Sequence, residues 1–253
     1  MNVLIVLAHP ERKSFNGGLV DGAVAQLIGE GHTVEVDDLY AEQFDPVERA
    51  GHYPHSAVAS DYFYPLNEQR AHHEENTLPQ DVQRELARLE WADLVIFQFP
   101  LWWHAQPAIL KGWFDRVLVY GGRYTSCMRY DKGYYRGKRA MLSVTTGSPE
   151  MTFQPFGRAG NMVHWLWPIH SSLYYVGFDV LAPQVSYGIQ GGGIRYQAEA
   201  DLIGHLEACK AAWASRLKSL SLNSELAIPF AGWGDWDEDG VLRQTTPLRW
   251  RLG

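Results

Sequence analysis

Three short segments of the sequence carry side chains suited to binding a flat, phosphate-bearing ligand. The first runs from His9 to Asn16 and places basic and hydroxyl side chains just ahead of a predicted helix. Free backbone N–H groups and the dipole at a helix start attract phosphate. The segment matches neither the GxxxxGK nor the GxGxxG phosphate motif. A capped helix beside a solvated loop remains an equally good interpretation of these residues alone.

The second segment, residues 98–104, contains two adjacent tryptophans and a histidine directly after an apolar run. Backbone amides around Pro100 and Trp103 could hydrogen-bond the edge of a heterocycle while an indole packs beside it. The alternative is that both indoles fill the core. Because the segment lies at the predicted ligand-binding edge of a sheet, we favour a functional role.

The third segment, Thr145 to Ser148, follows another apolar run. Gly147 permits close approach of the backbone to a ligand, and the hydroxyl groups could serve the polar side of a ring. Taken alone, it is equally typical of a β-turn. The argument for a binding site rests on all three segments meeting at one edge.

Other polar groups give weaker signals. Residues 121–126 could flank the site. The run His72–Glu75 could hold a metal, but no second ligand group stands at a zinc-like spacing, so we predict an exposed polar loop and no metal site. No GxSxG nucleophile motif is present.

Short apolar runs alternate with helical periods along the chain, which predicts an α/β fold. We expect a doubly wound, five-stranded parallel sheet with helices on both faces, and ligands bind such sheets at the carboxyl ends of the strands. Residues 41–79 read as an irregular loop. We expect a domain over residues 1–220 and an extension over 221–253 that packs on the domain or on a dimer partner. The predicted strands are 3–8, 33–36, 94–97, 140–145 and 180–185, and the predicted helices are 15–27 (capped by Ser14), 81–90, 107–119, 158–174 and 202–220.

Composition excludes several classes of protein. The net charge of −7 and the lack of a basic block argue against a nucleic-acid-binding protein. No apolar stretch approaches the ~18–20 residues of a membrane-spanning helix, and the start of the chain lacks the features of a signal peptide. Cys127 and Cys209 show no metal-binding spacing. We therefore expect a reduced, cytoplasmic protein, although a disulfide between them is not ruled out by the sequence.

The three segments resemble the NAD(P)H:quinone oxidoreductase family of the DT-diaphorase type, which has a flavodoxin-like fold. The resemblance rests on LIVLAHPERKSFN (4–16), ADLVIFQFPLWWHAQPAILKGWFDRV (92–117), YDKGYYRGKRAMLSVTTG (130–147), and WP with GFDVLAPQ (167–168 and 177–184). It covers roughly residues 1–220. It implies bound FAD, NADH or NADPH as donor, a quinone acceptor, two-electron ping-pong hydride transfer, and a homodimer whose active sites are built from both subunits.

The resemblance also implies roles for individual residues. Trp103 and His104 are expected to face the substrate, and Tyr124, Thr125, Ser126 and Tyr175 are expected to reach it from the other subunit. Flavin contacts are implied for His9, Ser14, Phe15, Asn16, Pro100, Leu101, Trp102, Trp103, Thr145, Thr146, Gly147, Ser148, Phe153 and Arg195.

The chain departs from the family pattern at several of these positions. Ser148 replaces a glycine and Ser126 a tyrosine, and the family's Tyr and His beyond the TTG loop correspond to Phe153 and Ala159. Neither Phe nor Ala can carry a proton, so the catalytic residues stay unassigned. The pair is dispensable, or it is replaced by His104, Arg158 or His164, or the chain is a poor quinone reductase. A regulatory flavoprotein subunit of a membrane transport system and an FMN electron carrier are the alternatives.

Overall fold

The computed structural model describes residues 1–57, 59, 61–190, 198–221 and 227–243. Its sheet is parallel, with the strand order β2-β1-β3-β4-β5 and with β6 also paired to β4. This is the flavodoxin order, and it confirms the predicted fold class. The strands are β1 (Asn2–Leu7), β2 (Thr33–Asp38), β3 (Leu94–Pro100), β4 (Arg139–Thr145), β5 (Asp179–Val180) and β6 (Gln184–Ser186).

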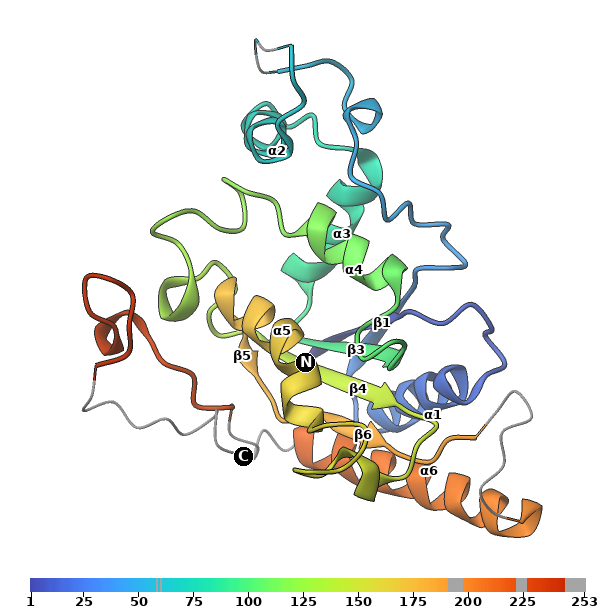
Figure 1. The fold of residues 1–253 in the computed structure, drawn as a ribbon. Coiled ribbons are helices and arrows are strands. Elements are labelled where there is room, and N and C mark those ends of the chain that lie inside the picture. Colours follow the sequence, from blue (N-terminus) through green and yellow to red (C-terminus); the bar gives the residue numbers. More distant parts are fainter. Residues whose placement is uncertain (58, 60, 191–197, 222–226, 244–253) are drawn as a thin grey trace.

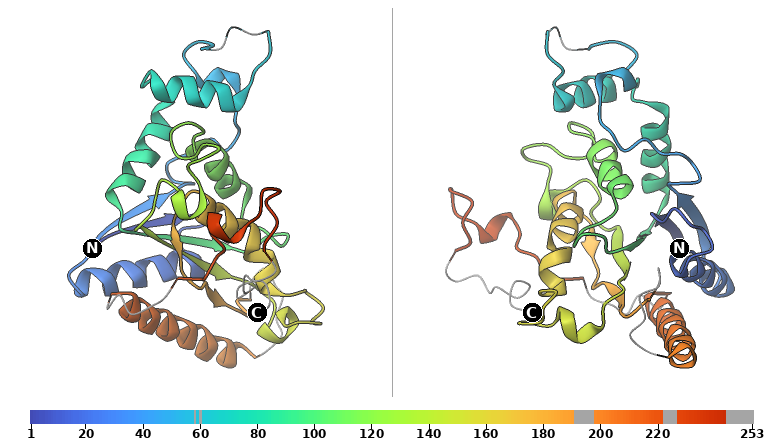
Figure 2. Two further views of the ribbon diagram at one scale, coloured as in Figure 1. Left: turned by 90° about the vertical axis from the view of Figure 1, so that its left-hand side faces the viewer. Right: turned by 45° about the vertical axis from the view of Figure 1, so that its right-hand side comes forward.

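Helices cover both faces of the sheet (Figures 1 and 2). On one face α1 (Phe15–Gly29) and α6 (Glu199–Ser221) enclose an apolar cluster around Ile5, Ile96 and Trp213. The other face is covered by α3 (Gln80–Trp91), α4 (Ala108–Val117) and α5 (Met162–Tyr175). Because β1, β3 and β4 are buried on both sides, they are apolar along nearly their whole length.

The predicted fifth strand is divided in two. We expected one strand over 180–185, whereas β5 ends at Val180 and β6 begins at Gln184. Pro183 lies between them, and because proline has no N–H group it cannot contribute to a ladder of hydrogen bonds. Each short strand then pairs with a different part of β4.

Residues 41–79 are not wholly irregular, as we had expected. They contain a 3-10 turn (Ala50–His52) and α2 (Pro65–Glu74), which projects beyond α3 and α4 (Figures 1 and 2). The buried face of α2 consists of Glu68, Gln69 and His72, so the apolar periodicity that marks a surface helix is missing. His72 is fully buried, which corrects the prediction of an exposed loop.

The described part of the C-terminal extension packs on its own chain. Ile228 N–H donates to Val180 O at 2.7 Å, and Tyr174 Oη donates to Ala231 O at 3.0 Å. A 3-10 turn (Trp233–Asp235) contacts residues 129–131, where Trp233 Nε1 donates to Arg129 O. Both cysteines are free thiols. Among the described helices, none has the length and apolar character needed to cross a bilayer.

Candidate active site

A chain of buried hydrogen bonds joins the carboxyl ends of β3 and β4 to the start of α1. Asn16 Nδ2 donates to Thr145 Oγ1 at 3.0 Å, and Gln98 Nε2 donates to Asn16 Oδ1 at 2.8 Å. All three side chains are buried. We call Asn16, Gln98 and Thr145 the strand-end cluster. This cluster brings the three sequence segments together. The side chains of Asn16 and Thr145 hydrogen-bond each other inside it.

A cavity of about 390 Å³ opens above this edge. Its volume lies in the range of small-molecule sites, roughly 300–1,000 Å³. The second and third segments both line it, together with residues of the segment that precedes α5 and of the segment that follows β6. The lining residues are Leu101, Trp103, His104, Thr146, Gly147, Ser148, Phe153, Ala159, Ile189 and Gln190.

The loop after β3 forms a strained turn at the rim of this cavity. Trp102 and Ala105 exchange backbone hydrogen bonds, and the two residues between them have positive φ angles, 50° at Trp103 and 63° at His104. Such angles are unfavourable for bulky residues and cluster at functional sites. The Trp103 side chain is 95% exposed. The turn therefore holds a bare indole at the mouth of the cavity.

The first segment lies beside this turn. His9 and Trp102 approach with ring centroids 6.0 Å apart. Ser14 caps α1 as expected, since its Oγ accepts from Gly17 N at 3.3 Å. Arg12 pairs with Asp21 and donates to Gly17 O, so its guanidinium is already engaged.

The residues at this edge fit a flavin. Among the described hydrogen bonds, none uses the backbone N–H groups of Trp103, His104, Gly147 or Ser148 as donors. These donors suit the carbonyl-bearing edge of an isoalloxazine, as the indole and Leu101 suit its flat face. Gln98 Oε1 is buried and has no partner among the described residues. The donor set, an orphaned acceptor and an apolar wall agree with the chemistry of the ring.

The two positions that depart from the family pattern lie in the cavity wall. Phe153 and Ala159 both line it. His104 lines it too, and its ring contacts Trp165 in a tilted arrangement, with 4.4 Å between centroids. Of the three replacements considered from the sequence, Arg158 and His164 are exposed and do not belong to the lining. His104 is the one imidazole that the described structure brings to the site.

The other expected substrate residues do not reach this cavity within one chain. Tyr124 and Tyr175 contact each other at 5.4 Å and line a separate cavity of about 410 Å³. Thr125 Oγ1 accepts from Met128 N at 3.0 Å within a turn, beside Ser126. The expectation that these residues serve a partner's site stays a prediction. Arg195 lies outside the described residues.

Three contributors to the site were not identified from the sequence. Gln98 could have been found as a polar residue inside the otherwise apolar run Leu94–Pro100. Ile189 lines the cavity and is held there by its backbone, since its N–H donates to Thr146 O at 2.9 Å. Trp165 supports the rim by donating from Nε1 to Ala159 O at 2.7 Å. Neither of the last two contacts leaves a signal in the sequence.

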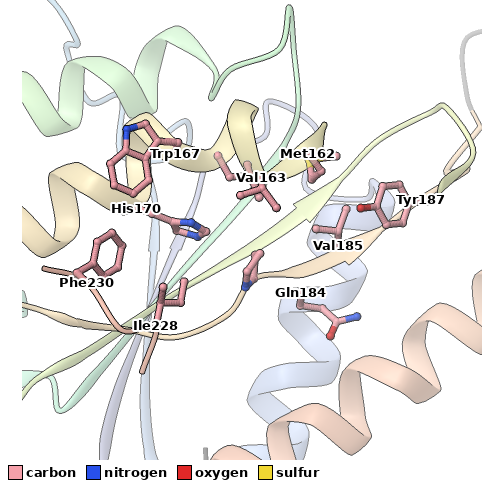
Figure 3. Close-up of a pocket in the computed structure, with 11 residues that line it drawn as sticks. Met162, Val163, Trp167, His170, Gln184, Val185, Tyr187, Ile228 and Phe230 are labelled. Carbon is pink, nitrogen blue, oxygen red and sulfur yellow. The ribbon is translucent and has the colours of Figure 1, made fainter. Parts of the chain in front are cut away.

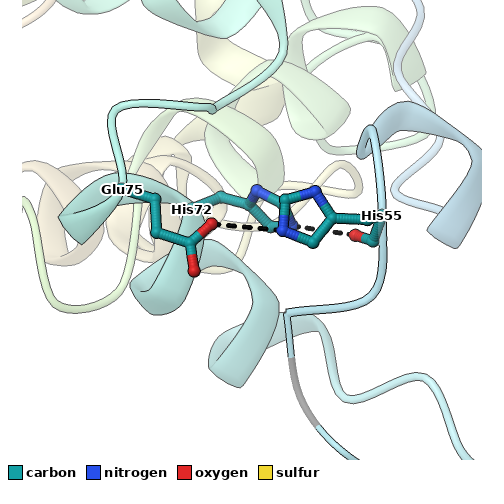
Figure 4. A group of neighbouring side chains, drawn as sticks. All are labelled: His55, His72 and Glu75. Atoms are coloured by element: carbon teal, nitrogen blue, oxygen red, sulfur yellow. Dashed lines mark hydrogen bonds and ion pairs between the residues drawn. The ribbon is translucent and has the colours of Figure 1, made fainter.

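A second cluster, of side chains that could bind a metal ion, lies in the projecting segment that contains the 3-10 turn Ala50–His52 and α2 (Figure 4). The ligand atoms of His55, His72 and Glu75 lie within 4.8 Å of one another. His72 Nε2 donates to His55 O at 3.0 Å and Nδ1 accepts from Thr77 Oγ1 at 2.7 Å, while His55 Nε2 lies 3.2 Å from Glu75 Oε2. Both nitrogens of His72 are thus engaged. In this arrangement the cluster ties the loop around His55 to α2.

Comparison with known proteins agrees with this geometry. The family model for the flavodoxin-like fold matches residues 1–211. The ribosyldihydronicotinamide dehydrogenase [quinone] of Mus musculus is 41% identical over 219 residues, which is 86% of this chain and 91% of that protein. The NAD(P)H dehydrogenase [quinone] 1 of Cavia porcellus is 44% identical over 187 residues, covering 74% of this chain and 68% of that protein.

A solved structure shows the same likeness in three dimensions. A protein from Klebsiella pneumoniae, assigned as a quinone reductase, superimposes with a TM-score of 0.85 at 36% identity, over 96% of this chain and 94% of that one. The similarity to these relatives agrees with the order of the strands and with the cavity at the carboxyl edge of the sheet. The chain belongs to the NAD(P)H:quinone oxidoreductase family, on a flavodoxin-like fold.

Proposed function

We propose that this protein is an FAD-dependent NAD(P)H:quinone oxidoreductase that carries two electrons from NADH or NADPH to a quinone in ping-pong order. The observation that carries the proposal is the cavity at the carboxyl edge of the sheet, with its bare indole and with backbone N–H groups that donate to none of the described residues. The flavin supplies the electron-transfer chemistry. The chain binds it, orients donor and acceptor over it, and stabilises charge near it.

Individual residues share this work. Ser14 and the start of α1 serve the phosphates, and Gly147 and Ser148 offer N–H groups to the polar edge of the ring. Trp103 provides a flat surface for the incoming nicotinamide or quinone. We propose that His104 donates or accepts the proton that Phe153 and Ala159 cannot carry. Tyr124 and Tyr175 are proposed to complete the site of a second subunit in a homodimer.

The test is anaerobic reduction of the FAD-loaded protein by NADH or NADPH, followed by reoxidation with menadione, in a stopped-flow spectrometer. Fast bleaching and fast reoxidation are expected. A protein that holds flavin tightly but is not bleached would overturn the proposal and favour a regulatory flavoprotein. Acid release of the bound flavin and chromatography distinguish FAD from the FMN of an electron carrier.

His104 has its own matched test. His104→Phe should slow turnover roughly tenfold to a hundredfold, since a general acid–base group contributes ~10²–10⁴ and an auxiliary one less. The dependence of the rate on pH should flatten as well. His164→Phe, which alters an exposed histidine outside the cavity, should leave both unchanged. Equal rates in the two variants would leave the reaction without a protein-borne proton carrier at this cavity.

A further inference from the structure

A further cavity, of about 480 Å³, lies between α5, the β5–β6 connection and the C-terminal extension. Aromatic and aliphatic side chains make most of its wall, and none of its lining residues is charged at neutral pH. The lining residues are Met162, Val163, Leu166, Trp167, His170, Pro183, Gln184, Val185, Tyr187, Ile228 and Phe230. Figure 3 shows that they come from both sides of the cavity.

One polar group in this wall is unpaired. His170 is 6% exposed, and its Nε2 is buried without a hydrogen-bond partner among the described residues. Its ring extends from α5 toward the space that Val185 and Ile228 border (Figure 3). Burial lowers the pKa of His170 to about 4, so the imidazole is neutral at physiological pH. A buried nitrogen without a partner is rare and costly, and a ligand that pairs with it would remove the cost.

The chemistry of the wall defines the ligand. An anion would lose its hydration with no positive charge to replace it, since the imidazole is neutral. A hydroxyl group can both donate and accept, so it pairs with Nε2 in either tautomer of the ring. The flat side chains of Trp167, Tyr187 and Phe230 suit an aromatic body.

We propose that this cavity is a binding site for an uncharged aromatic alcohol or phenol, whose hydroxyl group hydrogen-bonds His170 Nε2. The site is separate from the flavin cavity and does not depend on the proposed function. The two cavities share no lining residue.

The site is nonetheless mechanically linked to the flavin cavity. Tyr187 of the new site contacts Phe153 of the flavin cavity, with 5.7 Å between ring centroids. The residues next to Tyr187 are bonded to the third loop: Thr146 N–H donates to Ser186 O, and Gly188 N–H donates to Ser148 O, both at 3.0 Å. A ligand that moves Tyr187 should therefore also disturb the flavin.

The experiment titrates 2-naphthol into the FAD-loaded protein and follows binding by calorimetry. We expect a Kd of about 0.1 mM, typical of a ligand of this size. His170→Leu removes the partner and keeps the wall apolar, so affinity should fall about tenfold. Val163→Trp adds bulk from a 40% exposed position and should abolish binding without disturbing the core. His164→Leu, its neighbour on α5 and outside the cavity, should bind as the wild type does.

Two further readouts use the wild-type protein. The imidazole ¹⁵N resonances of His170 should shift on binding, and the flavin absorption spectrum should change through Tyr187 and Phe153. A second compound, the carboxylate 2-naphthoate, carries a negative charge. It should bind at least tenfold more weakly than the neutral 2-naphthol.

Several results would overturn the proposal. They are no binding up to about 1 mM, equal affinity in wild type and both cavity variants, or complete competition by menadione together with unchanged His170 resonances. If Val163→Trp instead alters the sedimentation behaviour of a protein that does not bind naphthol, a second copy of the chain covers the cavity.

Discussion

Two buried polar clusters lie on the same sheet, one beside β2 and the other beyond the ends of β3 and β4. In the first, which we call the Arg88 cluster, Arg88 contacts Glu35, Asp37, Glu42 and Glu85 at 2.6–3.0 Å. Four carboxyl groups thus surround one guanidinium group. The strand-end cluster is uncharged, contains a Gln98 Oε1 that has no partner among the described residues, and lies beneath a strained turn.

The two clusters differ in what they contribute: the first contributes to the stability of the fold, and the second also to ligand binding. In the Arg88 cluster the carboxyl groups pair with Arg88 and Arg84 inside the chain, and the one atom of the cluster left without a partner among the described residues, Asp37 Oδ2, is fully buried. The strand-end edge presents backbone N–H groups and an indole to a cavity and leaves the buried Gln98 Oε1 without a partner among the described residues, which stabilises the folded chain less but prepares it for a ligand. Substitutions in the first should change stability alone, whereas those in the second should change binding as well.

The largest expected effect comes from Arg88→Met. It leaves the fully buried Glu85 with only the partly exposed Arg84 as a cation and removes a donor to the buried Asp37, so the free energy of unfolding should fall by about 3–5 kcal/mol. Urea unfolding measures this loss. Arg84→Met on the same helix removes a guanidinium that is 43% exposed and should cost at most about 1 kcal/mol. A loss below about 1 kcal/mol in Arg88→Met would show that the cluster does not hold β2 to α3.

Asn16→Ala tests the other cluster. It removes the partner of Gln98 Nε2 and of Thr145 Oγ1, and a buried group left unpaired costs about 1–3 kcal/mol. The Kd for FAD, measured by flavin fluorescence, should rise about tenfold at the same time. Asn2→Ala is the control, because Asn2 Nδ2 donates to Trp91 O at the opposite end of β1. If both variants weaken FAD equally, the strand-end cluster has no special role in binding.

Asp37→Asn should have a smaller effect of opposite sign. Burial and the neighbouring Glu85 raise the pKa of Asp37 to about 9, from 3.8. A carboxyl group whose pKa is raised on folding loses its stabilising contribution as pH rises from 3.8 toward 9. Asn imitates the protonated form and does not titrate. The variant should therefore be about 1–2 kcal/mol more stable than wild type near pH 8, with the gain vanishing near pH 4.

Unfolding in urea at several pH values measures this trend. Asp239→Asn, at an exposed position in the C-terminal extension, should show no such dependence on pH. A gain that is constant from pH 4 to 9, or a loss at high pH, would mean that Asp37 is ionised in the folded protein.

The clusters also show which features a sequence can reveal. The apolar runs 94–97 and 140–145 predicted the strands observed as Leu94–Pro100 and Arg139–Thr145, since burial on both faces demands continuous apolar residues, and their order along the chain implied the edge where the loops meet. Helix α2 was missed because its buried face is polar. A break at Pro183 was likewise overlooked within a run that is mostly apolar.

The site was only partly predictable for a different reason. The loops that bear Trp103 and Gly147 follow strands, so topology places them. Whether His104 or His164 faces the cavity depends on a turn with positive φ, which bulky residues adopt only when their surroundings impose it. The pairing of Tyr187 with Phe153, and the isolation of His170, arise from packing between segments distant in sequence.

Trp103→Gly should give the smallest effect. In this variant we expect stability to rise and activity to fall. Glycine accepts the positive φ at this position, so stability should rise by up to about 1 kcal/mol. Loss of the indole removes a stacking surface worth about 0.5–1.5 kcal/mol, so kcat/KM with menadione should fall by roughly twofold to tenfold. Phe156→Gly is a matched control, since Phe156 is also fully exposed and has a φ of 69° but does not line the cavity. It should gain the same stability at unchanged kcat/KM. If the two variants lose activity equally, or if Trp103→Gly is the less stable protein, the strain at the rim is not connected to binding, and the contrast between the two clusters reduces to one of charge.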